Sequence, residues 1–104
     1  MADEIPTLPL KERLILELLI ETSPMFGLQL VDASRGRLKR GTVYVTLGRM
    51  EQKRLIKSRL EAPPPAVGGM PRRIYEPTAI GRRVLAAWTA LSRVMGRLNP
   101  EFAR

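Results

Sequence analysis

A chain of 104 residues, 44% of them hydrophobic and 27% charged, can bury one core but leaves little room for a second. Histidine and cysteine are both absent, which removes disulfides, thiolate metal sites, the thiol nucleophile and the commonest general base. The net charge of +8 favours a polyanionic partner, either nucleic acid or an anionic lipid surface. We therefore expect a single domain that is not an enzyme and holds no metal or cofactor.

Positive charge is concentrated in the middle of the chain. Residues 1–34 carry two basic and six acidic side chains, whereas residues 35–59 carry nine basic and one acidic. This central excess fits nucleic-acid binding and, equally, a solvated basic face. The basic residues do not form one amphipathic membrane helix, and the N-terminus lacks the pattern of a signal peptide. We expect a cytoplasmic protein without membrane contact.

Apolar residues at helical spacing predict an amphipathic helix near the start of the chain. Leucines recur from Leu10 onwards, while charged side chains occupy the other faces. Ser23-Pro24 ends this helix, because proline disfavours a helical conformation in the residue before it. A shorter second helix is predicted from Phe26 to Ser34.

The segment from Thr42 to Thr46 supports two interpretations. Its β-branched and aromatic residues alternate as they do in a strand. Val43, Leu47 and Met50, however, are spaced four and three residues apart, and good helix formers follow them. We favour the helix over the strand.

A hairpin is predicted after this helix. Alternation of apolar and polar residues from Leu55 to Ala62 indicates one strand, and Arg72 to Glu76 forms a second short strand. The proline- and glycine-rich residues 63–71 between them cannot continue either regular element. The two strands therefore form a long-looped hairpin, which is a wing.

The last predicted element is a long helix capped by Thr78. Its apolar residues form one seam with heptad-like spacing, and a second apolar stripe lies beside it. Because a small core covers one stripe, we expect the other to pair with a second copy; alternatively, both stripes wrap around one core. Residues 1–77 thus form the first part of one compact unit and residues 78–104 its dimerisation helix. The seam consists of Val84, Trp88, Leu91, Met95 and Leu98.

The predicted elements follow one another in the order of a winged helix-turn-helix with an added C-terminal helix: helix, helix, helix, strand, loop, strand, helix. The predicted fold is therefore mainly α with a small β-hairpin. From Leu10 to Leu98 the chain resembles the PadR family of transcriptional regulators, in its shorter subfamily with a single C-terminal helix. The resembling segments are Met25 to Leu30 in the second helix, Arg40 to Glu51 in the recognition helix, and Arg72 to Tyr75 with Thr78 and Gly81 after the wing.

The sequence departs from the family pattern at two positions. Val45 stands where the family usually has proline, and Arg54 stands where it usually has glycine. Glycine there commonly takes the left-handed conformation that ends a helix, which costs a residue with a Cβ about 1 kcal/mol. We expect the fold to accommodate Arg54, which adds positive charge beside the phosphates.

The resemblance implies a regulator that binds duplex DNA, and the helix over residues 41–53 supplies a face for the major groove. With the apolar side inward, the opposite face consists of side chains at three- and four-residue spacing. Arg49 is suited to guanine or to a phosphate, and Gln52 to adenine. A methyl group of Thr42 or Val45 is suited to the methyl group of thymine.

Other residues are expected to hold the DNA backbone. The resemblance implies this role for Tyr44, and the alternative is that its ring packs half-buried within the protein. Arginines on the wing reach an adjacent minor groove or the backbone. The candidates are Lys39, Arg40, Lys53, Lys57 and Arg59 for the phosphates, and Arg72 and Arg73 on the wing.

Together these features predict a sequence-specific repressor that binds a palindromic operator as a homodimer, with half-sites about one helical turn apart. Repression is what the resemblance implies. The alternatives are a winged-helix module that binds another protein and an architectural DNA-binding protein without operator specificity. Trp88 either anchors the dimer interface or lines a pocket for a small hydrophobic or aromatic effector.

Overall fold

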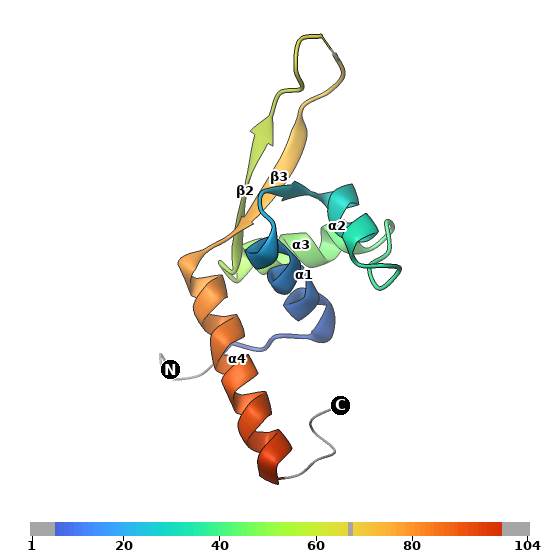
Figure 1. Ribbon diagram of the computed structural model, residues 1–104. Coiled ribbons are helices and arrows are strands. Elements are labelled where there is room, and N and C mark those ends of the chain that lie inside the picture. The colour runs from blue at the N-terminus through green and yellow to red at the C-terminus, as the bar shows by residue number, and fades with distance from the viewer. Residues whose placement is uncertain (1–5, 67, 99–104) are drawn as a thin grey trace.

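The computed structural model of this protein describes residues 6–66 and 68–98. Four helices and a three-stranded antiparallel sheet make up this part of the chain, which confirms the mainly α fold with a small β part. Figure 1 shows the hairpin projecting from one end of the body and the last helix from the other. The elements are α1 (Leu10–Glu21), β1 (Met25–Phe26), α2 (Gly27–Ala33), α3 (Val43–Gln52), β2 (Ile56–Glu61), β3 (Arg72–Pro77) and α4 (Ala79–Leu98).

The sheet contains one strand more than the predicted hairpin. Strands β2 and β3 pair antiparallel from Ile56 opposite Pro77 to Glu61 opposite Arg72, as the wing requires. On the other edge of β3, the short β1 places Met25 and Phe26 opposite Tyr75 and Ile74. Two residues are too few to show a strand's alternation, so only the pairing partner defines β1. The sheet order β1-β3-β2 ties the start of α2 to the wing.

The segment that supported two interpretations is helical. Val43, Leu47 and Met50 lie on one side of α3 and are almost completely buried. A strand would send alternate residues to opposite faces and could not bury these three together. The helical period therefore prevails because it satisfies the core, despite the β-branched composition.

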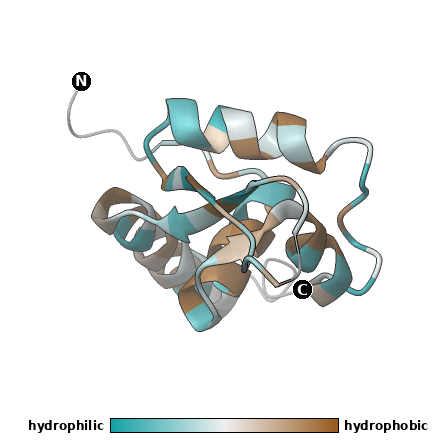
Figure 2. Ribbon diagram, turned by 90° about the horizontal axis from the view of Figure 1, so that it is seen from above, coloured by the Kyte–Doolittle hydropathy of each residue, from teal (hydrophilic) through white to brown (hydrophobic). Residues whose placement is uncertain are grey.

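The core lies between α1, α2, α3, the sheet and the first half of α4. Figure 2, viewed from the hairpin end, shows the helices arranged around the strands, each with hydrophobic and hydrophilic residues along it. Ser34 fixes the connection from α2 to α3: its hydroxyl donates to the Val31 carbonyl (2.7 Å) and accepts from the Leu38 amide (2.9 Å). The completely buried apolar side chains are Ile15, Leu16, Leu19, Leu30, Leu47, Met50 and Leu55.

The junction between α3 and α4 is held by a turn and a cap. Arg54 adopts the left-handed conformation with φ of +62°, in the place where the family pattern has glycine. The Thr78 hydroxyl donates to the Arg54 carbonyl (2.6 Å) and accepts from the Gly81 amide (2.9 Å), so it is the cap expected for α4. The cap thus links the turn that follows α3 to the start of α4. Within residues 6–66 and 68–98, none of the helices has the length and apolar character to cross a bilayer.

Candidate nucleic-acid interface

The outer face of α3 carries the side chains expected to read DNA. Val45 is 57% exposed and Tyr44 is 51% exposed. Thr42, Arg49 and Gln52 are exposed as well, while the apolar side of the helix faces the core. The burial pattern therefore agrees with the separation of faces predicted from helical spacing. An exposed helix face with one cation, one amide and small apolar groups suits the edges of base pairs.

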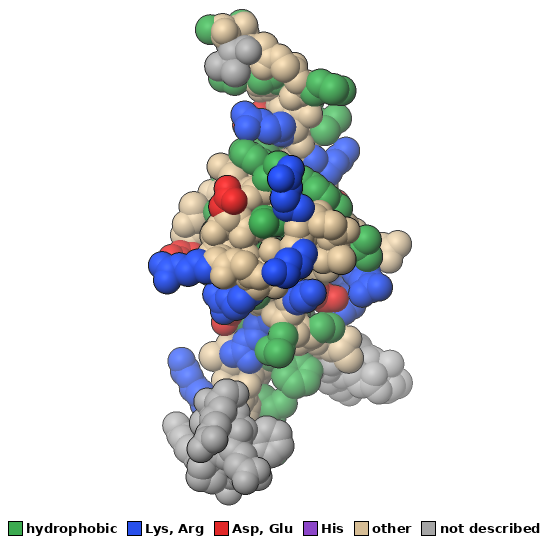
Figure 3. Space-filling view, turned by 90° about the vertical axis from the view of Figure 1, so that its right-hand side faces the viewer, with side chains coloured by type: hydrophobic (Ala, Val, Ile, Leu, Met, Phe, Trp, Pro, Cys, Tyr) green, Lys and Arg blue, Asp and Glu red, His purple; other side chains and the backbone are tan. Residues whose placement is uncertain are grey.

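Basic residues flank the start of this helix. The carbonyl of Lys39 accepts from the amides of Thr42 (3.2 Å) and Val43 (2.9 Å), which fixes the turn that leads into α3. Lys39 and Arg40 themselves are exposed. Figure 3, which looks at the side of α2 and the following loop, shows Lys and Arg side chains spread over the body with few acidic ones.

Both arginines of the wing are held by neighbouring side chains. The Arg72 guanidinium lies 4.5 Å from the centre of the Phe26 ring, a cation–π contact. Arg73 donates to the Ser58 hydroxyl (3.0 Å), which in turn donates to the Glu51 carboxylate of α3 (2.7 Å). This chain of hydrogen bonds connects the wing to the helix beside it. The roles of Ser58 and Glu51 could not be predicted from the sequence, because the three residues come from separate elements.

A cleft of about 270 Å³ lies between the start of α3 and the wing. It continues the exposed surface from the helix to the hairpin. Its position would let one stretch of DNA backbone contact both elements. The lining residues are Phe26, Leu28, Tyr44, Pro71, Arg72 and Arg73.

Two of the basic candidates already have carboxylate partners. Lys53 donates to Glu12 (2.8 Å) and to the Thr7 carbonyl (3.3 Å), and Glu12 is only 3% exposed. These contacts direct the Lys53 side chain toward α1 rather than toward the outer side of α3. Lys53 is the residue at which α3 ends. Arg59 forms an ion pair with Glu76 on the neighbouring strand. The field that these two cations offer to a phosphate is correspondingly weaker.

Tyr75 lies buried on β3. Burial raises the pKa of its hydroxyl above the ordinary value of 10.0, and the negative charge of Glu51 adds to this shift. The positive charge of Arg73 acts in the opposite direction. The phenol is thus neutral in the native protein at ordinary pH.

The predicted seam on α4 is divided between the protomer's core and its surface. Val84 is 7% exposed and belongs to the core. Trp88 is partly buried and packs against that core, and its indole N–H donates to the Pro6 carbonyl (2.8 Å). Leu91 is 40% exposed and Met95 is partly buried. The side chain of Leu98 lies outside the described residues.

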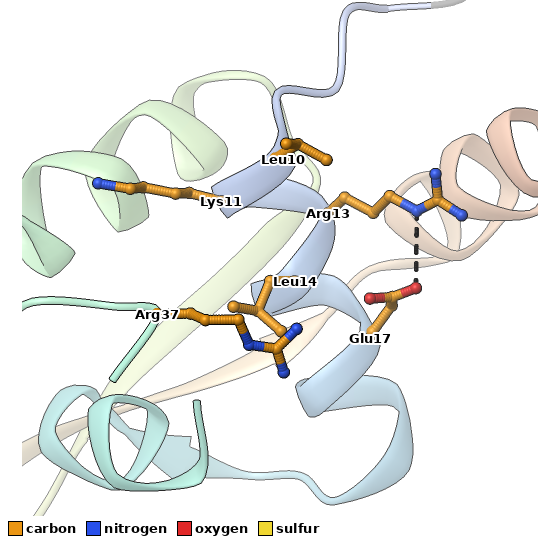
Figure 4. Close-up of a pocket in the computed structure, with 6 residues that line it drawn as sticks. All are labelled: Leu10, Lys11, Arg13, Leu14, Glu17 and Arg37. Atoms are coloured by element: carbon orange, nitrogen blue, oxygen red, sulfur yellow. Dashed lines mark ion pairs between the residues drawn. The ribbon is translucent and has the colours of Figure 1, made fainter. Parts of the chain in front are cut away.

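Two further clefts lie on the helices. One, of about 390 Å³, runs along α4 beside Ile20 of α1. The other, of about 480 Å³, lies on α1 beside Arg37. Figure 4 shows that Lys11 and Arg13 in this cleft point to opposite sides, and Arg13 pairs with Glu17 at 3.6 Å. Because its charged groups diverge, we assign no ligand to it.

The fold and this surface define a winged helix-turn-helix protein: α2 and α3 form the helix-turn-helix, and β2 and β3 form the wing. The model of the transcriptional regulator PadR-like family matches residues 15–87. The chain therefore belongs to this family of transcriptional regulators. No curated protein matches it.

Solved structures of other family members share the fold. A PadR family transcription regulator from hypervirulent Clostridium difficile is 29% identical, with a TM-score of 0.73, over 88% of this chain and 96% of that one. A second from Eggerthella lenta is also 29% identical, with a TM-score of 0.62, over 85% and 82% of the two chains. Bacillus subtilis PadR, solved in complex with operator DNA, is 17% identical with a TM-score of 0.69, over 80% of this chain and 48% of that chain.

Proposed function

We propose that this protein is a sequence-specific repressor that binds a palindromic DNA operator as a homodimer. The observation that carries the proposal is the exposed face of α3, with Arg49 and Gln52 on a helix whose other side is buried. Membership of a family of transcriptional regulators supports it, as does the operator complex of Bacillus subtilis PadR.

In the proposed complex, α3 lies in the major groove. Arg49 contacts guanine and Gln52 contacts adenine, while Val45 or Thr42 meets a thymine methyl group. Lys39, Arg40 and Tyr44 bind the backbone at the start of the helix, and Arg72 and Arg73 bind it at the wing or enter the minor groove. We assign Lys53 no contact with DNA, because its charge is matched by Glu12.

The proposed dimer forms through α4. Since Val84 is buried within the protomer, the interface begins further along the helix, at Trp88, Leu91 and Met95. Val94, which is 48% exposed, extends this surface. Residues 1–77 then bind DNA and residues 78–104 join the two copies. The hydrogen bond from the Trp88 indole to Pro6 of the same protomer restrains the ring, which supports a packing role for this residue over an effector site.

Selection from random duplexes at about 0.15 M salt tests the proposal, because salt screens the sequence-independent attraction. We expect an inverted repeat whose half-sites lie about one helical turn apart. The variant Arg49→Ala, Gln52→Ala is the control and is expected to lose the repeat while keeping its fold. A folded dimer that enriches no sequence contradicts the proposal. Salt-dependent binding alone would then indicate an architectural protein, and no binding at all a protein-interaction module.

A further inference from the structure

Gly27, the first residue of α2, is a glycine that its own backbone does not require. Its φ is outside the left-handed region, unlike the φ angles of Gly36, Gly68 and Gly69. Alanine is the better helix former, because glycine loses more conformational freedom when a helix forms. The reason for glycine at this position must therefore come from its surroundings.

Tyr44 supplies that reason. A Cβ built on Gly27 would lie 2.6 Å from Cε1, Cζ and Oη of the Tyr44 ring, closer than real Cβ atoms approach. A side chain at position 27 and the Tyr44 ring in its present place therefore exclude each other. The ring lies against the backbone at the start of α2, although Tyr44 belongs to α3.

This contact fixes where the phenol lies on the proposed DNA-binding surface. Tyr44 is half-exposed and lines the cleft between α3 and the wing, together with Phe26 and Arg72. Phe26 is held by a hydrogen bond from its amide to the Gln29 side chain (2.9 Å), and Arg72 stacks on the Phe26 ring. The start of α2 thus contacts the Tyr44 ring and fixes the backbone of Phe26, and both residues line the cleft.

We propose that Gly27 is a positioning residue for DNA binding: its missing side chain provides the seat that holds the Tyr44 hydroxyl at the junction of α3 and the wing. The inference rests on the proposed function, since the hydroxyl is positioned for a DNA backbone. Gly27 itself need not touch the DNA. It acts through Tyr44, and this dependence can be measured.

Gly27→Ala is expected to fold, because the displaced ring belongs to a half-exposed side chain beside an open cleft of about 270 Å³. In the free protein, the wild type should show a nuclear Overhauser effect between the Tyr44 ring protons and the Gly27 α-protons. Gly27→Ala should lose the corresponding effect while its melting temperature stays near that of the wild type. Gly41→Ala is the matched control, since a Cβ there meets nothing within 4 Å, and it should keep the effect.

A double-mutant cycle tests the role in binding, using a duplex selected as described above. Gly27→Ala should weaken binding about tenfold, the loss of roughly one hydrogen bond to a charged group. In the Tyr44→Ala background, the same change should have no further effect, because the residue it displaces is gone. An equal loss in both backgrounds overturns the proposal, as does an unaltered Overhauser effect in Gly27→Ala. If the wild type selects no duplex, the proposed function fails, while the Overhauser measurement still tests whether Gly27 positions the Tyr44 ring.

Discussion

Gly81, near the start of α4, rests on the backbone at the start of the wing. A Cβ at this position would collide with the Leu55 carbonyl oxygen and would lie 3.0 Å from Cδ2 of Leu16. A carbonyl in a hydrogen-bonded turn cannot move aside as a side chain can. Gly81 was part of the family resemblance, but the sequence alone did not indicate which atoms it approaches.

We expect Gly81→Ala to destabilise the fold by roughly 3 kcal/mol, because overpacking here must displace backbone. Gly48→Ala is the control: it adds the same methyl group to a helix, and that group meets nothing within 4 Å. The control should be neutral or stabilising by up to about 1 kcal/mol, since alanine favours the helix. Urea unfolding of both variants measures the difference. Equal stability of the two would refute the close contact.

The raised pKa of the Tyr75 hydroxyl predicts a loss of stability at high pH. The unfolded chain releases this proton near the ordinary value of 10.0, whereas burial makes the native protein retain it to higher pH. Above about pH 10 the native state therefore keeps a proton that the unfolded state has lost, and the stability of the native state falls as the pH rises through that range. Urea unfolding between about pH 8 and about pH 11 should show a steeper fall for the wild type than for Tyr75→Phe. Parallel curves would show that Tyr75 does not contribute.

At the scale of elements, the basic residues that flank α3 lie in two different environments. Arg40, just before the helix, is exposed, whereas Lys53 at its end pairs with the buried Glu12 of α1. Helical spacing predicts which side of α3 faces outward, but it says nothing about a carboxylate 41 positions away. The signal that could have found this pair is Glu12 itself, which is an acidic residue on the buried side of α1.

The two residues should therefore respond differently to loss of charge. Arg40→Gln is expected to weaken binding to all duplexes and to reduce the slope of log affinity against log salt by about 1. Lys53→Gln should leave this slope unchanged and instead lower the unfolding free energy by about 2 kcal/mol, because Glu12 loses its partner in the interior. Binding titrations over a range of salt and urea unfolding measure the two effects. A reduced slope for Lys53→Gln would return that residue to the DNA interface.

At the scale of the whole molecule, α4 contributes one part to the core and another part to the exposed surface. Its first half joins the core through Val84, and its second half exposes Leu91 and Val94. One stretch of its apolar residues is therefore covered within the protomer, and another remains exposed. The uncovered stretch is the part suited to a second copy.

We expect the double variant Leu91→Glu, Val94→Glu to weaken the proposed dimer by at least about 100-fold, because each exposed apolar side chain contributes from both copies. Sedimentation over a range of concentrations would measure the change. Leu60→Glu is the control, since Leu60 is also an exposed apolar residue but lies on the wing, and it should leave the dimer intact. A wild type that sediments as a monomer, or a double variant that stays dimeric, would refute this interface.

The sequence by itself determined the order of the four helices and the two wing strands, the buried side of α3, and the cap of α4 at Thr78. These features depend on spacing, propensity and turn residues within a few positions of one another, which are local properties of the chain. The concentration of positive charge in residues 35–59 was likewise visible without a structure. The resemblance to the family came from motifs of the same local kind.

Only the tertiary structure decided the contacts between distant segments. It paired β1 with β3, matched Lys53 with Glu12, brought Trp88 to Pro6, and placed the Tyr44 ring on Gly27. The partners in each case belong to different elements, so no periodicity relates them. Their approach depends on how the helices and the sheet pack around one core, which places residues distant in the sequence side by side.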